Sequence, residues 1–322
     1  MKRGLLALVV AALVVLPALA EPYALHVLIV VLINVVYAQA LYVIMRMGYL
    51  SFGHAGYIAL GGYTSALLAT KLAISPWIGF LAGAAVAACF AWALGAVTLK
   101  LRGIYFSLSV FAFAEVVNAV FRAFEFFGGP AGIAAVPRPA LFGTRLNTHL
   151  QFYYVVLVVA LVSLVFLYRL EWTRFGFTLL ALRTRETELL SESLGTDAAR
   201  YKTLAFVVSC FFCGLMGAVH VHYLRFVSPF VFTFFLSTDL MVYIMVGGLG
   251  SYWGPMLGTV LLTGLGEQLF AAGYYKSLVY AAVLLVVILA LPGGLISLPR
   301  VIGRGRSPER PAPVGAVAAR ER

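Results

Sequence analysis

Long apolar runs recur along the chain, and short segments rich in Gly, Pro or charged residues separate them. Several runs reach the roughly 20 residues that a helix needs to cross the hydrocarbon core of a bilayer. A transmembrane β-barrel would instead show short stretches in which apolar and polar residues alternate. The pattern therefore predicts an all-α, polytopic membrane protein with about eight to ten transmembrane helices. The candidate spans are residues 5–20, 24–45, 49–70, 77–99, 103–121, 152–168, 203–224, 237–249, 254–272 and 277–297.

The composition agrees with a chain that lies mostly in a membrane. Hydrophobic residues make up 63% of the 322 residues and charged residues 11%, and the mean hydropathy is +1.00. A soluble domain usually has about 25% charged residues. Among the candidate spans, 49–70 is rich in Gly and 237–249 is short, so these two are the weakest.

The distribution of basic residues predicts how the spans are oriented. If the N-terminus is cytoplasmic, the ten spans place 17 of the 23 Lys and Arg residues on the cytoplasmic side and six on the other side. Cytoplasmic loops of membrane proteins carry such an excess. We therefore expect both termini in the cytoplasm, and we attribute the net charge of +11 to topology and not to nucleic-acid binding.

The two ends of the chain differ from the middle. Residues 1–22 have a basic start, an apolar stretch and an Ala-Leu-Ala sequence, which suits a first transmembrane segment or a cleavable signal peptide. Residues 23–299 are expected to form one membrane domain with a loop at about 170–201. Residues 300–322 are rich in Pro, Gly and Arg, which predicts a disordered basic tail.

Charge is concentrated in one loop. Eleven of the 35 charged residues lie between Arg169 and Lys202. Leucines within this loop are spaced as on the apolar stripe of an amphipathic helix. Gly195 would end that helix in a left-handed conformation, and Thr196 or Asp197 would cap the next one. Such a helix could lie on anionic lipid, or it could be a docking helix for a cytoplasmic partner.

Two glycine-rich segments depart from the usual composition of a transmembrane helix. They read "MGYLSFGHAGYIALGGYTSALL" (47–68) and "MVGGLGSYWGPMLG" (245–258). Such segments allow close helix packing, or a helix break where the backbone lines a cavity enclosed by protein. For the second segment we expect a break or packing role at Gly247, Gly248, Gly250, Gly254 and Pro255. For the first, Ser51, Gly53 and His54 together favour a role in a substrate pathway.

Three acidic residues fall inside predicted spans, namely Glu115, Asp239 and Glu267. A charge at the bilayer centre is costly, so such residues usually face the interior of a bundle. Glu267 lies near the end of its span, which leaves Glu115 as the stronger pathway candidate. We expect no partner Arg or Lys for these carboxylates at depth, so a proton relay has little support.

The chain carries no sequence motif for catalysis or for a cofactor. It lacks the G-x-x-x-x-G-K-[ST] motif of a P-loop, a nucleophile–base constellation and a metal-ligand cluster. Cys210 and Cys213 have C-x-x-C spacing without a second ligand pair, so they are interpreted as small core residues. His220 and His222 are two residues apart and point to different faces of a helix. We therefore expect neither an enzyme nor a metal site.

Four segments resemble the permease subunits of branched-chain amino acid ABC transporters. The segments are "GYLSFGHAGYIALGGYTSALL", "LRGIYFSLSVFAFAEVV", "TRFGFTLLALRTRETELLSESLGTDAARYKTLAFVVSCFFCGLMGAVHVHYLRFVSP" and "GGLGSYWGPMLGTVLL". The resemblance implies a subunit of an importer in the bacterial inner membrane. Its partners would be a second permease chain, two cytoplasmic ATPase subunits that bind ATP and Mg²⁺, a periplasmic binding protein and membrane lipid. This chain itself would bind no cofactor and hydrolyse no ATP.

The resemblance also implies roles for particular residues. The charged loop would be the coupling loop that the ATPase grips, with Arg183, Glu188, Glu192 and Gly195 as contact and turn positions. The substrate pathway would include Ser51, Gly53, His54, Tyr57, Tyr105 and Glu115.

The loop "FGGPAGIAAVP" matches the family only loosely, so the substrate could be a branched-chain amino acid or a related small amino acid or amide. The alternative function is a self-sufficient secondary transporter or channel for small polar solutes. Paired charges within the membrane and an internal repeat would favour that alternative, and the sequence contains no convincing repeat.

Overall fold

The computed structural model describes residues 13–15, 17, 20–101, 103–141, 144–146, 148–268, 281–282, 285 and 294–297. The predicted tail at 300–322 and most of the predicted spans 5–20 and 277–297 lie outside these residues. Five of the described helices are long and apolar enough to cross a membrane. They are α2 (Pro22–Met45), α4 (Pro76–Thr98), α5 (Ile104–Ala123), α6 (His149–Glu171) and α9 (Ala198–Leu224). The predicted all-α, polytopic fold is therefore confirmed.

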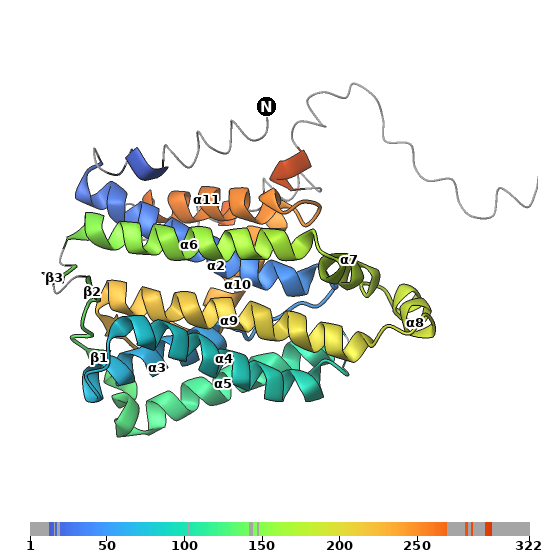
Figure 1. The fold of residues 1–322 in the computed structure, drawn as a ribbon, viewed down its shortest axis with the longest axis horizontal. Coiled ribbons are helices and arrows are strands. Elements are labelled where there is room, and N and C mark those ends of the chain that lie inside the picture. The colour runs from blue at the N-terminus through green and yellow to red at the C-terminus, as the bar shows by residue number, and fades with distance from the viewer. Residues whose placement is uncertain are drawn as a thin grey trace, which may run out of the picture.

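The remaining helices are shorter and lie within the bundle or at its ends. Within the bundle are α3 (His54–Lys71), α10 (Phe234–Gly247) and α11 (Trp253–Gln268). Helices α7 (Arg174–Ala181) and α8 (Arg185–Ser193) project from one end, as Figure 1 shows. At the opposite end lie the short strands, β1 (Ile133–Ala134), β2 (Ala140–Leu141), β3 (Thr144–Arg145) and β4 (Phe226–Val227). The short 3₁₀ helices are η2 (Glu125–Phe127), η3 (Gly129–Ala131) and η5 (Leu295–Ser297).

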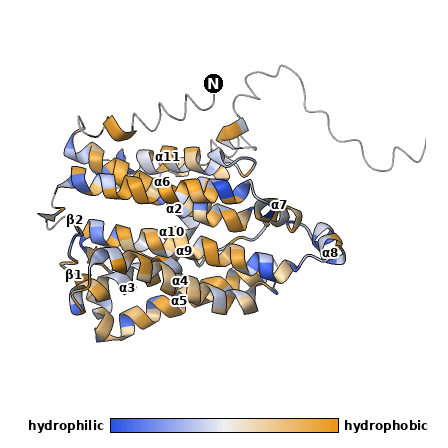
Figure 2. Cartoon of the chain, viewed as in Figure 1, coloured by the Kyte–Doolittle hydropathy of each residue, from blue (hydrophilic) through white to orange (hydrophobic). Residues whose placement is uncertain are grey.

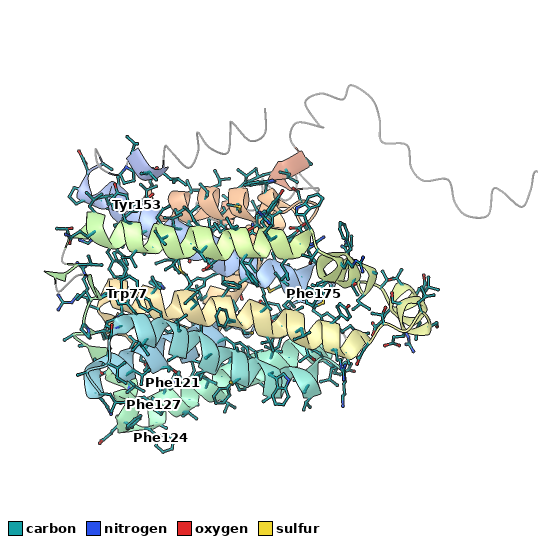
Figure 3. The ribbon with its side chains drawn as sticks, viewed as in Figure 1. Trp77, Phe121, Phe124, Phe127, Tyr153 and Phe175 are labelled. Atoms are coloured by element: carbon teal, nitrogen blue, oxygen red, sulfur yellow. The ribbon has the colours of Figure 1, made fainter. Side chains whose placement is uncertain are left out.

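The bundle has an apolar middle and two polar ends. Figure 2 shows hydrophobic residues along the long helices, with hydrophilic residues concentrated near the strands and near α7 and α8. Figure 3 shows Trp77 and Tyr153 at the strand end and Phe175 at the base of α7. Aromatic side chains often mark the two interfaces of a membrane protein. The long axis of the bundle is therefore the direction in which the helices would cross a bilayer.

Helix α9 lies at the centre of the bundle and packs closely on α3 and α4. A Cβ atom on Gly61 of α3 would collide with the backbone of Gly214 in α9, and one on Gly83 of α4 would collide with the backbone of Gly61. Gly217 likewise approaches the backbone of Ile58. Small residues let transmembrane helices pack at backbone contact, where van der Waals attraction and polar bonds hold them together.

The first glycine-rich segment is only partly helical. Residues 46–53 lead without regular helix from the end of α2 into the bundle, and α3 begins at His54, so the predicted span 49–70 is helical over only part of its length. Tyr49, Ser51 and Gly53 are nevertheless buried. The Ser107 hydroxyl donates to the Leu50 carbonyl at 2.6 Å. Irregular backbone at membrane depth is tolerated where protein encloses it and supplies such bonds.

The second glycine-rich segment forms the turn between α10 and α11. Gly248 ends α10 with φ of +102°, a conformation that strongly favours glycine. Gly247 packs against the backbone of Gly254, and Gly258 packs against that of Tyr243. The two helices thus form a close-packed pair instead of two independent spans.

Two short antiparallel strand pairs close the far end of the bundle. Ile133 of β1 pairs with Val227 of β4, which fastens the 122–151 loop to the end of α9, and β2 pairs with β3. His222 of α9 reinforces this connection, because its Nδ1 lies 2.6 Å from the carbonyl oxygen of Pro137. These contacts tie the loop to the bundle.

The charged loop contains two helices where the leucine pattern predicts one. Thr184 interrupts the pattern because its backbone is extended and its side chain accepts a hydrogen bond from the Thr187 N–H, which caps α8. Gly195 adopts φ of +89° after α8, as its predicted left-handed stop requires. Asp197 caps α9 by accepting from the Arg200 N–H at 3.0 Å.

Candidate functional sites

His54 lies at the start of α3 and joins two other parts of the bundle. Its Nδ1 is 2.8 Å from the Ser51 hydroxyl, and its Nε2 is 2.8 Å from the Ser209 hydroxyl of α9. Ser209 donates its own proton to the Ala40 carbonyl of α2 at 2.6 Å. Ser209 must therefore accept from Nε2–H, which leaves Nδ1 of a neutral ring to accept from Ser51. This chain of hydrogen bonds satisfies both ring nitrogens.

The surroundings of His54 are closed. The imidazole is fully buried, and its edge packs against the rings of Tyr57 and Phe206. A Cβ on Gly53 would collide with the backbone of Val110 in α5. Ser51, Gly53, His54 and Tyr57 therefore form one tightly packed cluster at the break before α3, where α2, α5 and α9 meet.

The other two predicted pathway residues lie elsewhere. Tyr105 is 69% exposed on the outer face of α5, and the Glu115 side chain on the same helix is 40% exposed. The Oε2 of Glu115 lies 3.8 Å from Nη2 of Arg122, which lies one residue before the end of α5 and so is not a partner at depth. The fold thus divides the six predicted residues into a buried cluster and an exposed α5 face.

The predicted coupling residues also differ in their surroundings. Glu192 is exposed, and the Arg183 carbonyl packs against Gly48 in the irregular segment. Glu188 is buried, and its Oε1 lies 2.7 Å from Nζ of Lys202 in α9. This placement differs from the expectation that Glu188 contacts a partner directly, because its carboxylate points into the protein.

Lys202 connects the charged loop to the His54 cluster. Its ammonium lies 5.3 Å from the ring centroid of Tyr49 in the irregular segment. Lys202, Phe206 and Ser209 are spaced so that they share one face of α9. Sequence reasoning missed Lys202, because it lies 14 residues beyond Glu188 and no helical spacing relates the two.

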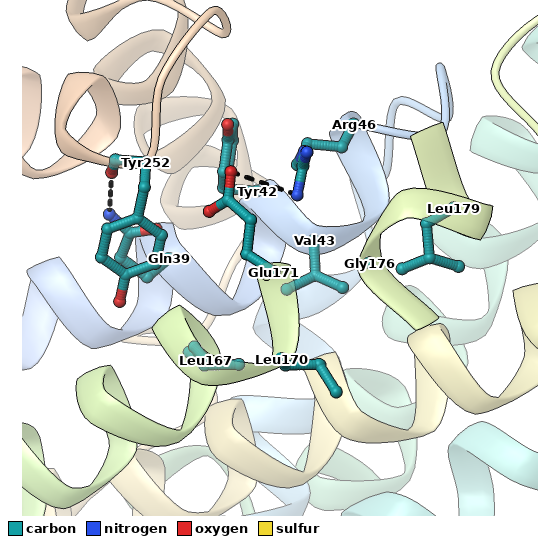
Figure 4. A pocket seen from close by; sticks show the side chains of 10 residues that line it. All are labelled: Gln39, Tyr42, Val43, Arg46, Leu167, Leu170, Glu171, Gly176, Leu179 and Tyr252. Carbon is teal, nitrogen blue, oxygen red and sulfur yellow. Dashed lines mark hydrogen bonds and ion pairs between the residues drawn. The ribbon is translucent and has the colours of Figure 1, made fainter. Parts of the chain in front are cut away.

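A small cavity lies where α2, α6 and α7 meet, and Figure 4 shows the side chains around it. Arg46 Nη1 lies 3.2 Å from Oε1 of Glu171, and Gln39 donates to the Tyr252 carbonyl at 2.7 Å. The cavity volume is about 20 Å³, which suits about one water molecule and excludes an amino acid. These contacts therefore join α2 to the end of α6 and to the turn before α11, and they do not form a substrate site.

A larger groove of about 740 Å³ runs between α6 and the α4–α9 pair. Its walls include Trp77, Phe166 and Phe211, and Ser163 is the single hydroxyl-bearing residue among the side chains that line it. Such walls suit an apolar occupant and offer little to a charged or zwitterionic substrate.

The fold and these sites define a polytopic helical membrane protein with an internal helix break and a charged arm, α7–α8, at one end. Residues 23–288 match the family model described as "Branched-chain amino acid transport system / permease component". The chain belongs to this family.

The chain is similar to both permease proteins of known branched-chain amino acid transport systems. It is 30% identical to the high-affinity branched-chain amino acid transport system permease protein LivM of Salmonella typhimurium and of Escherichia coli K12, over 79% of this chain. The chain spans 65% of the length of those LivM proteins. It is 23% identical to the corresponding LivH protein of Salmonella typhimurium, over 79% of this chain and 88% of LivH. No solved structure matched the chain.

Proposed function

We propose that this chain is the permease subunit of an ATP-driven importer in the bacterial inner membrane. Its substrate would be a branched-chain amino acid or a closely related small amino acid or amide, delivered by a periplasmic binding protein. The chain would pair with a second permease, and two cytoplasmic subunits would bind ATP and Mg²⁺. Membership of the permease family and the names of the LivM and LivH relatives support this proposal.

The observation that carries the proposal is the outer surface of the α7–α8 arm. Leu189, Leu190 and Leu194 are 51%, 62% and 80% exposed on a segment that projects beyond the bundle (Figure 1). Apolar side chains clustered on a charged surface segment are typical of a protein–protein contact. An ATPase subunit that covers these leucines would hold α8 from outside, while the Glu188–Lys202 pair holds it from inside.

The arm is connected to the part of the fold where a helix is broken. Glu188 reaches Lys202, Lys202 lies over Tyr49, and the Arg183 carbonyl contacts Gly48. A movement of α8 would therefore act directly on residues 46–53 and, through α9, on the hydrogen bonds of His54. In this mechanism the His54 cluster is a hinge of the pathway, and it rearranges when the ATPase subunits close.

One observation favours the alternative of a secondary transporter. The Glu115–Arg122 pair is a paired charge within a span, which a transporter driven by an ion gradient could use. Reconstitution distinguishes the two functions. The importer requires ATP and the ATPase subunits for uptake into proteoliposomes, whereas the alternative takes up solute without them when an ion gradient is applied.

The docking role of the arm has its own test. The double substitution Leu190→Glu and Leu194→Glu should abolish co-purification of the ATPase subunits and ATP-dependent uptake together. Leu101→Glu is the control, because it places the same charge on an exposed leucine at the same end of the bundle but outside the arm. Normal ATPase binding by the double variant would refute the docking role.

A further inference from the structure

The outer face of α5 carries polar groups among exposed apolar side chains such as Leu108 and Val116, which are 61% and 60% exposed. Residues 105, 109, 112, 115, 119 and 122 succeed one another at helical spacing. Tyr105 is exposed near one end, and the Ser109 hydroxyl donates back to the Tyr105 carbonyl at 2.7 Å. Glu115 and Arg122 follow, with 40% and 42% of their side chains exposed. Ala112 and Ala119 lie between the polar side chains and are exposed. Their small side chains leave room beside the polar groups.

The carboxylate of Glu115 is unsuited to contact with lipid. Glu115 is the twelfth residue of a 20-residue apolar helix, so its Cα lies about 12 Å from the end of α5 nearest the strands. A carboxylate at that depth is strongly disfavoured against hydrocarbon, and intramembrane charges almost always face protein or a water-filled cavity. The described part of this chain leaves the face open. In the assembled protein, another chain or an aqueous path must therefore lie against it.

The two charges leave much of their hydrogen-bonding capacity unused. The distance of 3.8 Å between Oε2 and Nη2 is long for a charged hydrogen bond. Arg122 also donates from Nε to the Asn118 carbonyl at 3.3 Å, and Asn118 donates to the Phe232 carbonyl at 2.8 Å. A guanidinium has five donors and a carboxylate about four acceptor positions. The pair is thus held in place on one side and can accept a ligand on the other.

We propose that Glu115 and Arg122 form a transit site for the charged groups of a zwitterionic α-amino acid, in a path between α5 and the second permease chain. This inference rests on the proposed function and adds the residues that meet the substrate. The ammonium and carboxylate of an α-amino acid are attached to one carbon, so they lie side by side, as Glu115 and Arg122 do. Glu115 receives the ammonium, and Arg122 receives the carboxylate in a bidentate contact.

The proposal explains why the site holds both signs of charge. A zwitterion that leaves water must replace the solvation of both charged groups, and one fixed charge would compensate only one of them. Without substrate, the two charges of the site compensate each other, because the Glu115 carboxylate faces the Arg122 guanidinium. Weak, exposed contacts also suit a transit site, because the substrate has to leave it again.

The decisive test uses the complete transporter in proteoliposomes, with leucine and saturating binding protein. The double substitution Glu115→Gln and Arg122→Gln removes both charges without leaving an unpaired one, so a purely structural ion pair predicts near-normal uptake. A transit site predicts that the maximal uptake rate falls by roughly tenfold or more, because two charged contacts are lost. Ser109→Ala, on the same face, should keep the normal rate. ATPase binding by each variant verifies folding.

A second measurement tests whether water reaches the face. In a Cys89→Ala background, Ala119→Cys should react with a membrane-impermeant maleimide, and leucine should slow the reaction. Val162→Cys, on the exposed apolar face of α6, is the unreactive control. Normal uptake by the Gln/Gln variant, or an Ala119→Cys side chain that stays unreactive, would overturn the transit site. If the unmodified transporter takes up no amino acid at all, the proposed function fails instead.

Discussion

The ion pair between Glu188 and Lys202 joins α8 to α9. Both side chains are almost fully buried, and the ammonium also lies over the ring of Tyr49. A buried pair contributes little net stability compared with apolar residues, but removing one partner leaves a charge without compensation. The pair therefore specifies how α8 lies on α9 and on the irregular segment.

Removing the carboxylate should be costly. Glu188→Gln leaves the Lys202 ammonium buried without its carboxylate, which we expect to cost about 3–5 kcal/mol of unfolding free energy. Glu192→Gln, on the exposed side of the same helix, should change it by no more than about 0.5 kcal/mol. Thermal unfolding of the purified complex in detergent measures both. The exchange Glu188→Lys with Lys202→Glu should recover part of the loss, and equal stability of the two Gln variants would contradict this account.

At the scale of elements, the irregular start of α3 determines where the buried cluster lies. Residues 46–53 reach the interior without helix, so His54 lies within reach of Ser209, which is near the middle of α9. The glycines and small polar residues of this segment predicted a departure from simple helix. They did not predict where the helix starts again, because that depends on hydroxyl groups of α5 and α9 that satisfy the broken backbone and the imidazole.

The substitution His54→Leu tests the cluster. It removes two hydrogen bonds and leaves Ser51 without its acceptor, which we expect to cost about 1–3 kcal/mol. Uptake should fall while co-purification of the ATPase subunits is unchanged, since the arm lies away from this cluster. Thr259→Val is the control, because it removes a buried hydroxyl bond in α11 that involves none of these residues. If ATPase binding falls together with uptake, His54 is a folding residue and not part of a hinge.

The charged loop shows how far sequence patterns reach at this scale. Its amphipathic character and the turn at Gly195 follow from local residue preferences and agree with the structure. The sequence offered Thr196 or Asp197 as the next cap, and the structure has Asp197. The sequence did not predict the division into α7 and α8, because a threonine can either continue a helix or cap a new one. Thr184 caps α8. The burial of Glu188 was missed for another reason, since only the folded chain brings α9 against α8.

At the scale of the whole molecule, the arm and the helix break lie at different depths of one connected structure. α9 begins beside the arm, carries Lys202, Phe206 and Ser209 on one face, and ends at β4 on the far side of the bundle. Because α3 and α4 pack on α9 at backbone contact, these helices are expected to move together. Transmission of a force from the arm then requires a firm joint between α8 and α9.

Gly195 is that joint, and it can be altered without touching the outer surface of α8. Its φ of +89° is incompatible with proline, and its N–H donates to the Glu192 carbonyl at 2.9 Å. Gly195→Pro should therefore displace the end of α8, whereas Gly195→Asn should be tolerated because Asn adopts the left-handed region readily.

We expect the Pro variant to retain the ATPase subunits through the exposed leucines of α8. Its uptake rate should fall by roughly tenfold or more, since tight coupling depends on fixed geometry. Uptake and ATP hydrolysis measured on the same proteoliposomes separate the outcomes. Hydrolysis without uptake in the Pro variant supports a rigid joint, and normal uptake would mean that force reaches the bundle by contacts other than the α8–α9 turn.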